Sequence, residues 1–81
     1  MNRVLIIDDD RQLGQSFAKI LTQEGYSTAN AFSGREGIDM VHTFSPSLVV
    51  LDIRLPDMSG LEVFTVIHEH FPKLPVIIIT A

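Results

Sequence analysis

The fold is decided by the stretch Leu48-Val49-Val50-Leu51-Asp52-Ile53-Arg54-Leu55-Pro56-Asp57-Met58-Ser59-Gly60. Its first four residues form an apolar run, which meets the carboxylate of Asp52 and then a loop rich in turn-forming residues. A short β-branched run bounded by turn residues is typical of a strand that is buried on both faces of a parallel sheet. Asp52 would then lie at the carboxyl end of that strand, where open α/β sheets bind their ligands.

Further strands are predicted on both sides of this stretch. The apolar runs 4–7 and 75–80 predict the first and the fourth strand, and 26–29 predicts a weaker second strand at an edge of the sheet. The proline that opens the fourth strand is tolerated there because the strand start can dispense with its N–H. With 48–51 as the third strand, the chain contains four strands.

Helical patterns separate the predicted strands. The first has Asp9 or Asp10 as its N-cap and Gly25 after its carboxyl end. The other two begin with the Ser-x-x-Glu spacing of a capping box. The boxes are Ser33-Gly34-Arg35-Glu36 and Ser59-Gly60-Leu61-Glu62. The expected apolar faces are Leu13, Phe17, Ile20 and Leu21 on the first helix, Ile38 and Val41 on the second, and Phe64, Ile67 and Phe71 on the third.

The alternation of strands and helices predicts an α/β fold in three layers, with a parallel sheet and right-handed crossovers. If the first strand lies between the second and the third, the strand order is 2-1-3-4. The topological switch point then falls between strands one and three, whose carboxyl ends carry Asp8-Asp9 and Asp52. Three carboxylates that are distant in sequence would therefore converge on one crevice.

Converging carboxylates indicate a magnesium site. They repel one another unless a cation lies between them, and Mg²⁺ prefers hard oxygen ligands of this kind. A carboxylate beside such an ion can act as a nucleophile toward phosphorus, while the ion offsets the charge on the phosphoryl oxygens. We assign Asp52 as the nucleophile and a metal ligand, and Asp8 and Asp9 as further ligands. The backbone carbonyl of Arg54 could add another ligand, and Thr80 could donate a hydrogen bond to a phosphoryl oxygen.

Taken alone, each of these residues has a simpler explanation. The run Asp8-Asp9-Asp10 could be an acidic first helical turn, and Asp52 could be an ordinary turn residue. Asp57 is expected to act as a cap or turn residue of the loop rather than as a metal ligand. His68 and His70 lie two apart on a helix, so they face different directions and make a poor metal pair. The combination of aspartates carries the prediction.

Composition limits the remaining classes of protein. The chain has 81 residues, no cysteine and a formal net charge of −4, which allows one small domain, 1–81, and excludes a disulfide framework or a zinc–thiolate site. No apolar run approaches the ~20 residues of a membrane helix, and no export signal is evident. We therefore expect a soluble, cytoplasmic domain. Its acidic charge argues against direct binding to nucleic acid.

Three segments together match the pattern of a known family. They are Val4-Leu5-Ile6-Ile7-Asp8-Asp9-Asp10, the stretch Val49–Gly60 with its D-x-x-(L)-P-x-(M)-x-G pattern, and Ile77-Ile78-Ile79-Thr80-Ala81. With them the whole chain resembles the receiver domain of two-component response regulators.

The resemblance implies a flavodoxin-like sheet and a signalling role rather than that of an enzyme, beyond phosphorylation from small phosphodonors and autodephosphorylation. It implies that Asp52 accepts a phosphoryl group from the phosphohistidine of a sensor histidine kinase. It further implies that Asp8, Asp9 and the Arg54 carbonyl bind Mg²⁺, that Thr80 is the switch hydroxyl, and that an output domain controls transcription.

The resemblance also shows a departure at the carboxyl end. Receivers continue after the fourth strand with another helix, a fifth strand and a fifth helix, and this sequence ends at Ala81. The family places an essential lysine and a switch aromatic in that last part, and neither Lys19 nor Lys73 is expected to replace the lysine. On this interpretation the last βα unit is lacking, and the fourth strand is an apolar edge. We therefore expect self-association, such as a dimer joined at that strand, unless the rest of the domain lies beyond this sequence.

Three other functions explain parts of the sequence. An aspartyl phosphatase of the haloacid-dehalogenase type would use Asp8 as its nucleophile, but it expects Thr or Val at Gln12 and leaves Asp52 and Pro56 unexplained. A flavodoxin-like flavin binder would need a Ser/Thr/Gly loop after the first strand, where three aspartates would repel phosphate. A receiver fragment that serves only as a folding or association module would bind Mg²⁺ with little stable phosphorylation.

Overall fold

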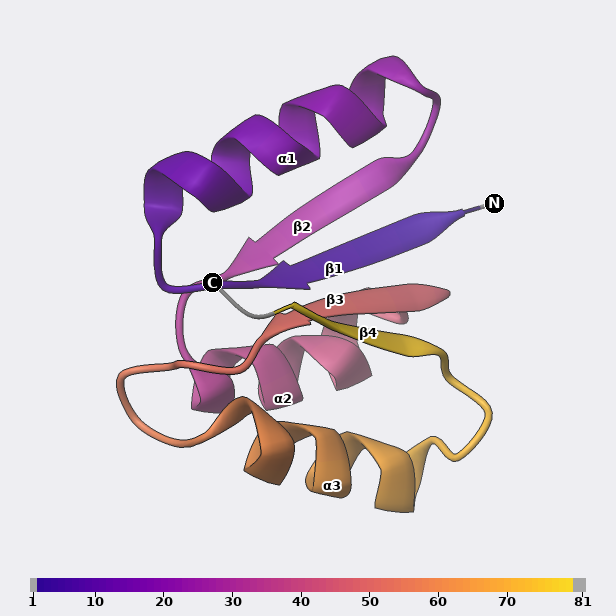
Figure 1. Ribbon diagram of the computed structural model, residues 1–81. Coiled ribbons are helices and arrows are strands. Elements are labelled where there is room, and N and C mark those ends of the chain that lie inside the picture. Colours follow the sequence, from indigo (N-terminus) through magenta and orange to yellow (C-terminus); the bar gives the residue numbers. More distant parts are fainter. Residues whose placement is uncertain (1, 80–81) are drawn as a thin grey trace.

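The computed structural model describes residues 2–79, which form one sheet with helices on both faces (Figure 1). The elements are β1 (Arg3–Ile7), α1 (Arg11–Gln23), β2 (Ser27–Ala31), α2 (Gly34–Phe44), β3 (Leu48–Asp52), α3 (Gly60–His70) and β4 (Val76–Ile79). All neighbouring strands are parallel, and their order is β2-β1-β3-β4. The predicted α/β class and strand order are confirmed.

The helices lie in two layers because each central strand is apolar on both faces. Alternate residues of β1 point to opposite sides, and the same holds for β3. Leu5 and Leu51 belong to a core beneath α2 and α3, whereas Ile6 and Val50 belong to a smaller core beneath α1. Figure 1 shows α1 on one side of the sheet and the other two helices on the opposite side. The unbroken apolar runs in the sequence follow from this double coverage.

The second strand differs most from its predicted bounds. The second strand was expected over 26–29, but β2 runs from Ser27 to Ala31 because its pairing with β1 continues to the partner of Ile7. The sequence pattern did not predict the last two residues of β2, because Asn30 interrupts the apolar residues. β4 pairs with β3 alone among the described strands, and Ile77 on it is 52% exposed. Both β2 and β4 are therefore edges of the sheet that residues 2–79 form.

The predicted helix caps are present, with variations in their bonds. Asp10 accepts a hydrogen bond from the Leu13 N–H (3.0 Å), so it is the N-cap of α1. Gly25 follows that helix with a φ of 97°, a conformation that glycine adopts readily. Ser59 is the N-cap of α3, but its hydroxyl accepts from the Leu61 N–H (3.1 Å) rather than from Glu62, as a capping box requires.

The apolar stripe predicted for α1 is only half buried. Phe17 and Leu21 pack against the smaller core, but Leu13 is 53% exposed and Ile20 is 57% exposed. The reason is the position of α1, which contacts β2 and β1 and leaves the β4 side of that sheet face without a helix in the described residues. No helix within residues 2–79 is long and apolar enough to cross a membrane.

Candidate functional site

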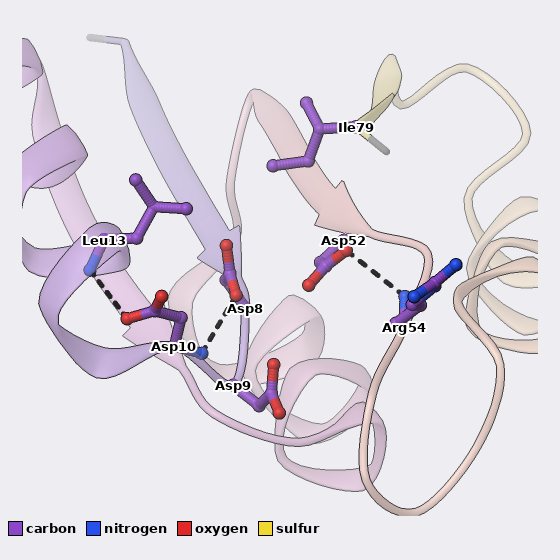
Figure 2. A pocket seen from close by; sticks show the side chains of 7 residues that line it. All are labelled: Asp8, Asp9, Asp10, Leu13, Asp52, Arg54 and Ile79. Carbon is purple, nitrogen blue, oxygen red and sulfur yellow. Dashed lines mark hydrogen bonds between the residues drawn. The ribbon is translucent and has the colours of Figure 1, made fainter. Parts of the chain in front are cut away.

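The carboxyl ends of the central strands open into a cavity of about 350 Å³ (Figure 2). Its lining comes from the residues after β1, the first turn of α1, the end of β3 and the end of β4. The lining residues are Asp8, Asp9, Asp10, Leu13, Asp52, Arg54 and Ile79. This is the predicted location, the switch point between β1 and β3.

The strand register brings the acidic residues together. Ile7 is opposite Leu51 in the parallel pair, so the residues that follow them, Asp8 and Asp52, lie side by side. With Asp9, they offer carboxylate oxygens that all lie within 4.8 Å of one another. Figure 2 shows the carboxylates of Asp8 and Asp52 in the space between the two strand ends. The predicted convergence of the three side chains is therefore present.

Asp8 is the most buried of the three aspartates. It is 4% exposed, and this burial raises the pKa of its carboxyl group above the ordinary value. The Asp10 N–H, which donates to Asp8 Oδ1 at 3.0 Å, lowers the pKa, whereas the negative charges of Asp52 and Asp9 raise it. The ionised cluster is thus electrostatically costly, and a cation at this place would reverse the sign of that cost.

Asp52 combines orientation with access. One of its oxygens, Oδ1, accepts a hydrogen bond from the Arg54 N–H at 3.2 Å. Its side chain is half-buried, so solvent molecules and reactants can reach the carboxylate. A carboxylate that is held in place and still accessible is suited to act as a nucleophile.

The remaining candidate residues are placed less completely. Arg54 lines the cavity, and the role of its backbone carbonyl stays a prediction. Thr80 lies outside the described residues, so its role as a switch hydroxyl also stays a prediction. Lys19 lies exposed on α1, and Lys73 lies in the loop that enters the opposite end of β4, away from the acidic cavity.

Asp57 acts as a cap, which is one of the two roles predicted for it. It lies in the loop before α3, but the helix that it caps is α2. Its carboxylate accepts hydrogen bonds from the N–H groups of Gly34 (2.8 Å) and Arg35 (2.9 Å) at the start of α2. These bonds lower the pKa of Asp57, with the Arg35 N–H as the largest cause. A local sequence pattern cannot reveal this contact because the partners are 22 and 23 residues away.

The acidic cluster has no counterpart in the described part of the chain. Within residues 2–79 no other group of three or more His, Cys, Asp or Glu side chains could hold a metal ion together. His68 and His70 separate as expected: His68 stacks on Phe64, whereas His70 contacts the ring of His42. The candidate site is therefore the cavity around Asp8, Asp9 and Asp52.

The fold and the cavity define a class, the doubly wound parallel α/β proteins with an acidic site at the switch point of the sheet. The family model of the response regulator receiver domain matches residues 4–81. The chain therefore belongs to the response regulator receiver family, whose members are signalling domains. This membership replaces the phosphatase and flavin-binding alternatives.

Curated relatives and solved structures agree with the family. The response regulator MprA of Mycolicibacterium vanbaalenii is 38% identical over 79 residues, which are 98% of this chain and 34% of that protein. MprA of Mycobacterium tuberculosis is 37% identical over the same length, again 98% of this chain and 34% of the relative. The chain thus spans about a third of the length of these two curated relatives.

Among solved structures, a CheY-like receiver domain of Methanospirillum hungatei superposes with a TM-score of 0.96 at 35% identity, covering 99% of this chain and 64% of that one. The response regulator TrrA of Thermotoga maritima, solved in complex with Mg²⁺ and BeF, superposes with a TM-score of 0.95 at 33% identity. The match covers all of this chain (100%) and 70% of TrrA.

Proposed function

We propose that residues 1–81 form a phosphoacceptor receiver domain in which Asp52 takes a phosphoryl group from the phosphohistidine of a sensor histidine kinase. One observation carries the proposal: three carboxylates lie within 4.8 Å of one another at the switch point, and Asp52 is the one held at a strand end while half-exposed. The family membership supports the kinase as the donor. The same proposal places the domain in the cytoplasm with that kinase.

The transfer is a displacement at phosphorus. A carboxylate oxygen of Asp52 forms a bond to the phosphorus atom, and the bond from phosphorus to the imidazole nitrogen of the donor breaks. The electron pair of the broken bond stays on that nitrogen, and the imidazole leaves as a neutral ring with one proton, either already on its other nitrogen or taken up at the freed one. The product is an aspartyl phosphate on this chain and an unmodified histidine on the kinase.

The residues of the cavity fit Mg²⁺. Asp8, Asp9, Asp52 and the backbone carbonyl of Arg54 would hold the ion, and all four supply hard oxygen ligands. Burial and the negative charges of Asp52 and Asp9 raise the pKa of Asp8, and a bound cation would offset this effect. Bound Mg²⁺ would neutralise charge on the phosphoryl oxygens during transfer. The Mg²⁺–BeF complex of TrrA supports the same ion for this chain.

The phosphorylated state would be read elsewhere in a longer response regulator. In this proposal Thr80 donates a hydrogen bond to the phosphoryl group, and an output domain that controls transcription responds. The MprA relatives, which are response regulators and of which the chain matches 34%, support a place for this domain within a longer response regulator. The exposed Ile77 on the β4 edge also supports self-association of this chain, which its mass in sedimentation equilibrium would reveal.

Phosphorylation with a small donor tests the proposal. The chain is incubated with Mg²⁺ and acetyl phosphate, and intact mass and peptide mapping locate the added group; Asp52→Asn is the matched control. We expect one phosphoryl group at Asp52 and none in the variant. A label on Asp8 would contradict the assignment. An unlabelled chain whose melting temperature still rises with Mg²⁺ would favour the module without phosphorylation.

A further inference from the structure

The first turn of α2 is capped by two residues from different parts of the chain. Ser33 Oγ accepts from the Glu36 N–H at 3.1 Å, which is the ordinary local cap. Asp57 accepts hydrogen bonds from the N–H groups of Gly34 (2.8 Å) and Arg35 (2.9 Å), the two residues that precede Glu36. A helix leaves its first N–H groups without partners inside the helix, so these contacts satisfy a need of the backbone. The negative charge of Asp57 also suits the positive end of the helix dipole.

The neighbour of Asp57 packs on the same helix end. A Cβ atom added to Gly34 would lie 2.4 Å from Cγ of Met58 and 2.9 Å from Cγ2 of Val63. Met58 can therefore lie against α2 only because position 34 has no side chain. The polar bonds of Asp57 and the packing of Met58 together attach the tip of the β3–α3 loop to α2.

The base of this loop is held as well. The Gly60 N–H donates to the Ile53 carbonyl at 2.8 Å, and Arg54 pairs with Ser59 across the loop. An added Cβ at Gly60 would lie 2.4 Å from the carbonyl oxygen of Asp52. The loop between Asp52 and Gly60 is thus closed at its base and attached at its tip.

These contacts form a continuous path that links Asp8 to Asp52 through β2, α2 and the β3–α3 loop. The Asp8 N–H donates to the Ala31 carbonyl at 3.0 Å, which joins the end of β1 to the end of β2. The chain passes from β2 into α2, whose first N–H groups bind Asp57, and the loop leads back from Asp57 to Arg54 and Asp52. Asp57 thus attaches to α2 the same loop that carries Arg54.

We propose that Asp57 is a positioning residue for the cavity, which fixes the loop so that the Arg54 backbone completes the set of Mg²⁺ ligands begun by the aspartates. The inference rests on the proposed function. Asp57 points its carboxylate at α2 and acts on the cavity only through the backbone of its loop.

Mg²⁺ affinity measured by titration calorimetry tests this role. Asp57→Asn removes the charge and leaves one carbonyl oxygen to face two N–H groups. The control is Asp39→Asn, the same change at an exposed position on α2. We expect Asp57→Asn to weaken Mg²⁺ binding on the order of 10-fold, the usual size of effects on ligand-supporting residues, with the control unchanged. Acetyl phosphate labelling of Asp52 should slow at low Mg²⁺ and recover at saturating Mg²⁺.

Amide hydrogen exchange separates this role from a purely structural one. The N–H groups of Gly34 and Arg35 should lose protection in Asp57→Asn and keep it in the control. If their protection is lost while Mg²⁺ affinity stays within about twofold of the unmodified chain, the positioning role is wrong. Should Asp57→Asn fail to fold, Asp57→Ser, which keeps one shorter acceptor and no charge, is expected to weaken Mg²⁺ binding on the order of 10-fold as well, and an unchanged affinity would equally contradict the proposal.

The two proposals fail in different ways. If the unmodified chain binds Mg²⁺ but takes no phosphoryl group, the proposed function is wrong, and the loss of affinity in Asp57→Asn still supports the positioning role. If the unmodified chain binds no Mg²⁺, both are wrong. If it is phosphorylated and Asp57→Asn binds Mg²⁺ normally, only the positioning role is wrong.

Discussion

Two acidic regions of this domain hold their carboxylates in opposite environments. In the cavity, Asp8 is 4% exposed, and burial together with its acidic neighbours raises its pKa. At the start of α2, the exposed Asp57 accepts hydrogen bonds from the Arg35 and Gly34 N–H groups, which lower its pKa. Asp57 has a backbone donor on each of its oxygens, whereas Asp8 has the Asp10 N–H on one oxygen and two acidic side chains beside it. Asp57 is therefore suited to anchor its loop to α2, whereas Asp8 is suited to bind a cation.

The largest effect is expected from a substitution in the cavity. Asp8→Asn should weaken Mg²⁺ binding on the order of 100-fold, because it removes the buried ligand. The same variant should raise the melting temperature of the metal-free chain by a few degrees, since it removes a buried charge. Its amide oxygen can still accept from the Asp10 N–H. Calorimetry with Mg²⁺ and with a chelator measures both effects, and a metal-free chain that melts lower would contradict this account.

A smaller effect is expected where the loop meets α2. Gly34→Ala should lower the free energy of unfolding by about 1–3 kcal/mol, because its methyl group overpacks against Met58. The control is Gly25→Ala, where no atom lies within 4 Å and the positive φ alone costs about 1 kcal/mol. Urea unfolding compares the two variants. A smaller loss at position 34 than at position 25 would mean that Met58 moves aside freely.

The smallest effects, and the sharpest test of the comparison, lie in the pH dependence of stability. The lowered pKa of Asp57 means that its contribution is present above its ordinary pKa of 3.8 and is lost as the pH falls through its folded value. Asp8 has the opposite sign: its raised pKa means that the folded state loses stability as the pH rises from 3.8 through the folded value.

Urea midpoints between acidic and neutral pH, measured with a chelator, reveal these signs through the variants. The urea midpoint of Asp8→Asn should exceed that of the unmodified chain by the largest amount at neutral pH. The midpoint of Asp57→Asn should fall below it by the largest amount at the same pH. Identical pH profiles for the two variants would show that the environments do not differ as described.

Much of the fold was predictable because it depends on local patterns. The runs at 4–7 and 48–51 are long enough and apolar enough to indicate strands buried on both faces, and Asp10 and Ser33 cap the helices that they were expected to begin. The convergence of Asp8 and Asp52 was also predictable, because strand order alone brings two strand ends together.

The rest depended on contacts that local patterns do not encode. The position of α1 leaves Leu13 and Ile20 exposed, although their spacing is that of a buried face. The hydrogen bonds of Asp57 to Gly34 and Arg35 join the β3–α3 loop to the start of α2, and a separation of 22 to 23 residues gives no local sequence signal. The sequence predicted that Asp57 is a cap or turn residue of its loop, and the structure shows that it caps the start of α2.

The pairing of β1 with β3 also has a consequence for how the chain folds. β1 is made first, yet it is central, and its Arg3 meets Ser47, a separation of 44 residues, through the Arg3 N–H and Ser47 Oγ at 2.9 Å. Closing so long a loop costs conformational entropy before any stabilising contact forms, and this cost slows folding. Asp8 and Asp52 meet only when this closure is complete. We therefore expect the acidic cavity to form late in folding, and Mg²⁺ binding measured during refolding would test this order.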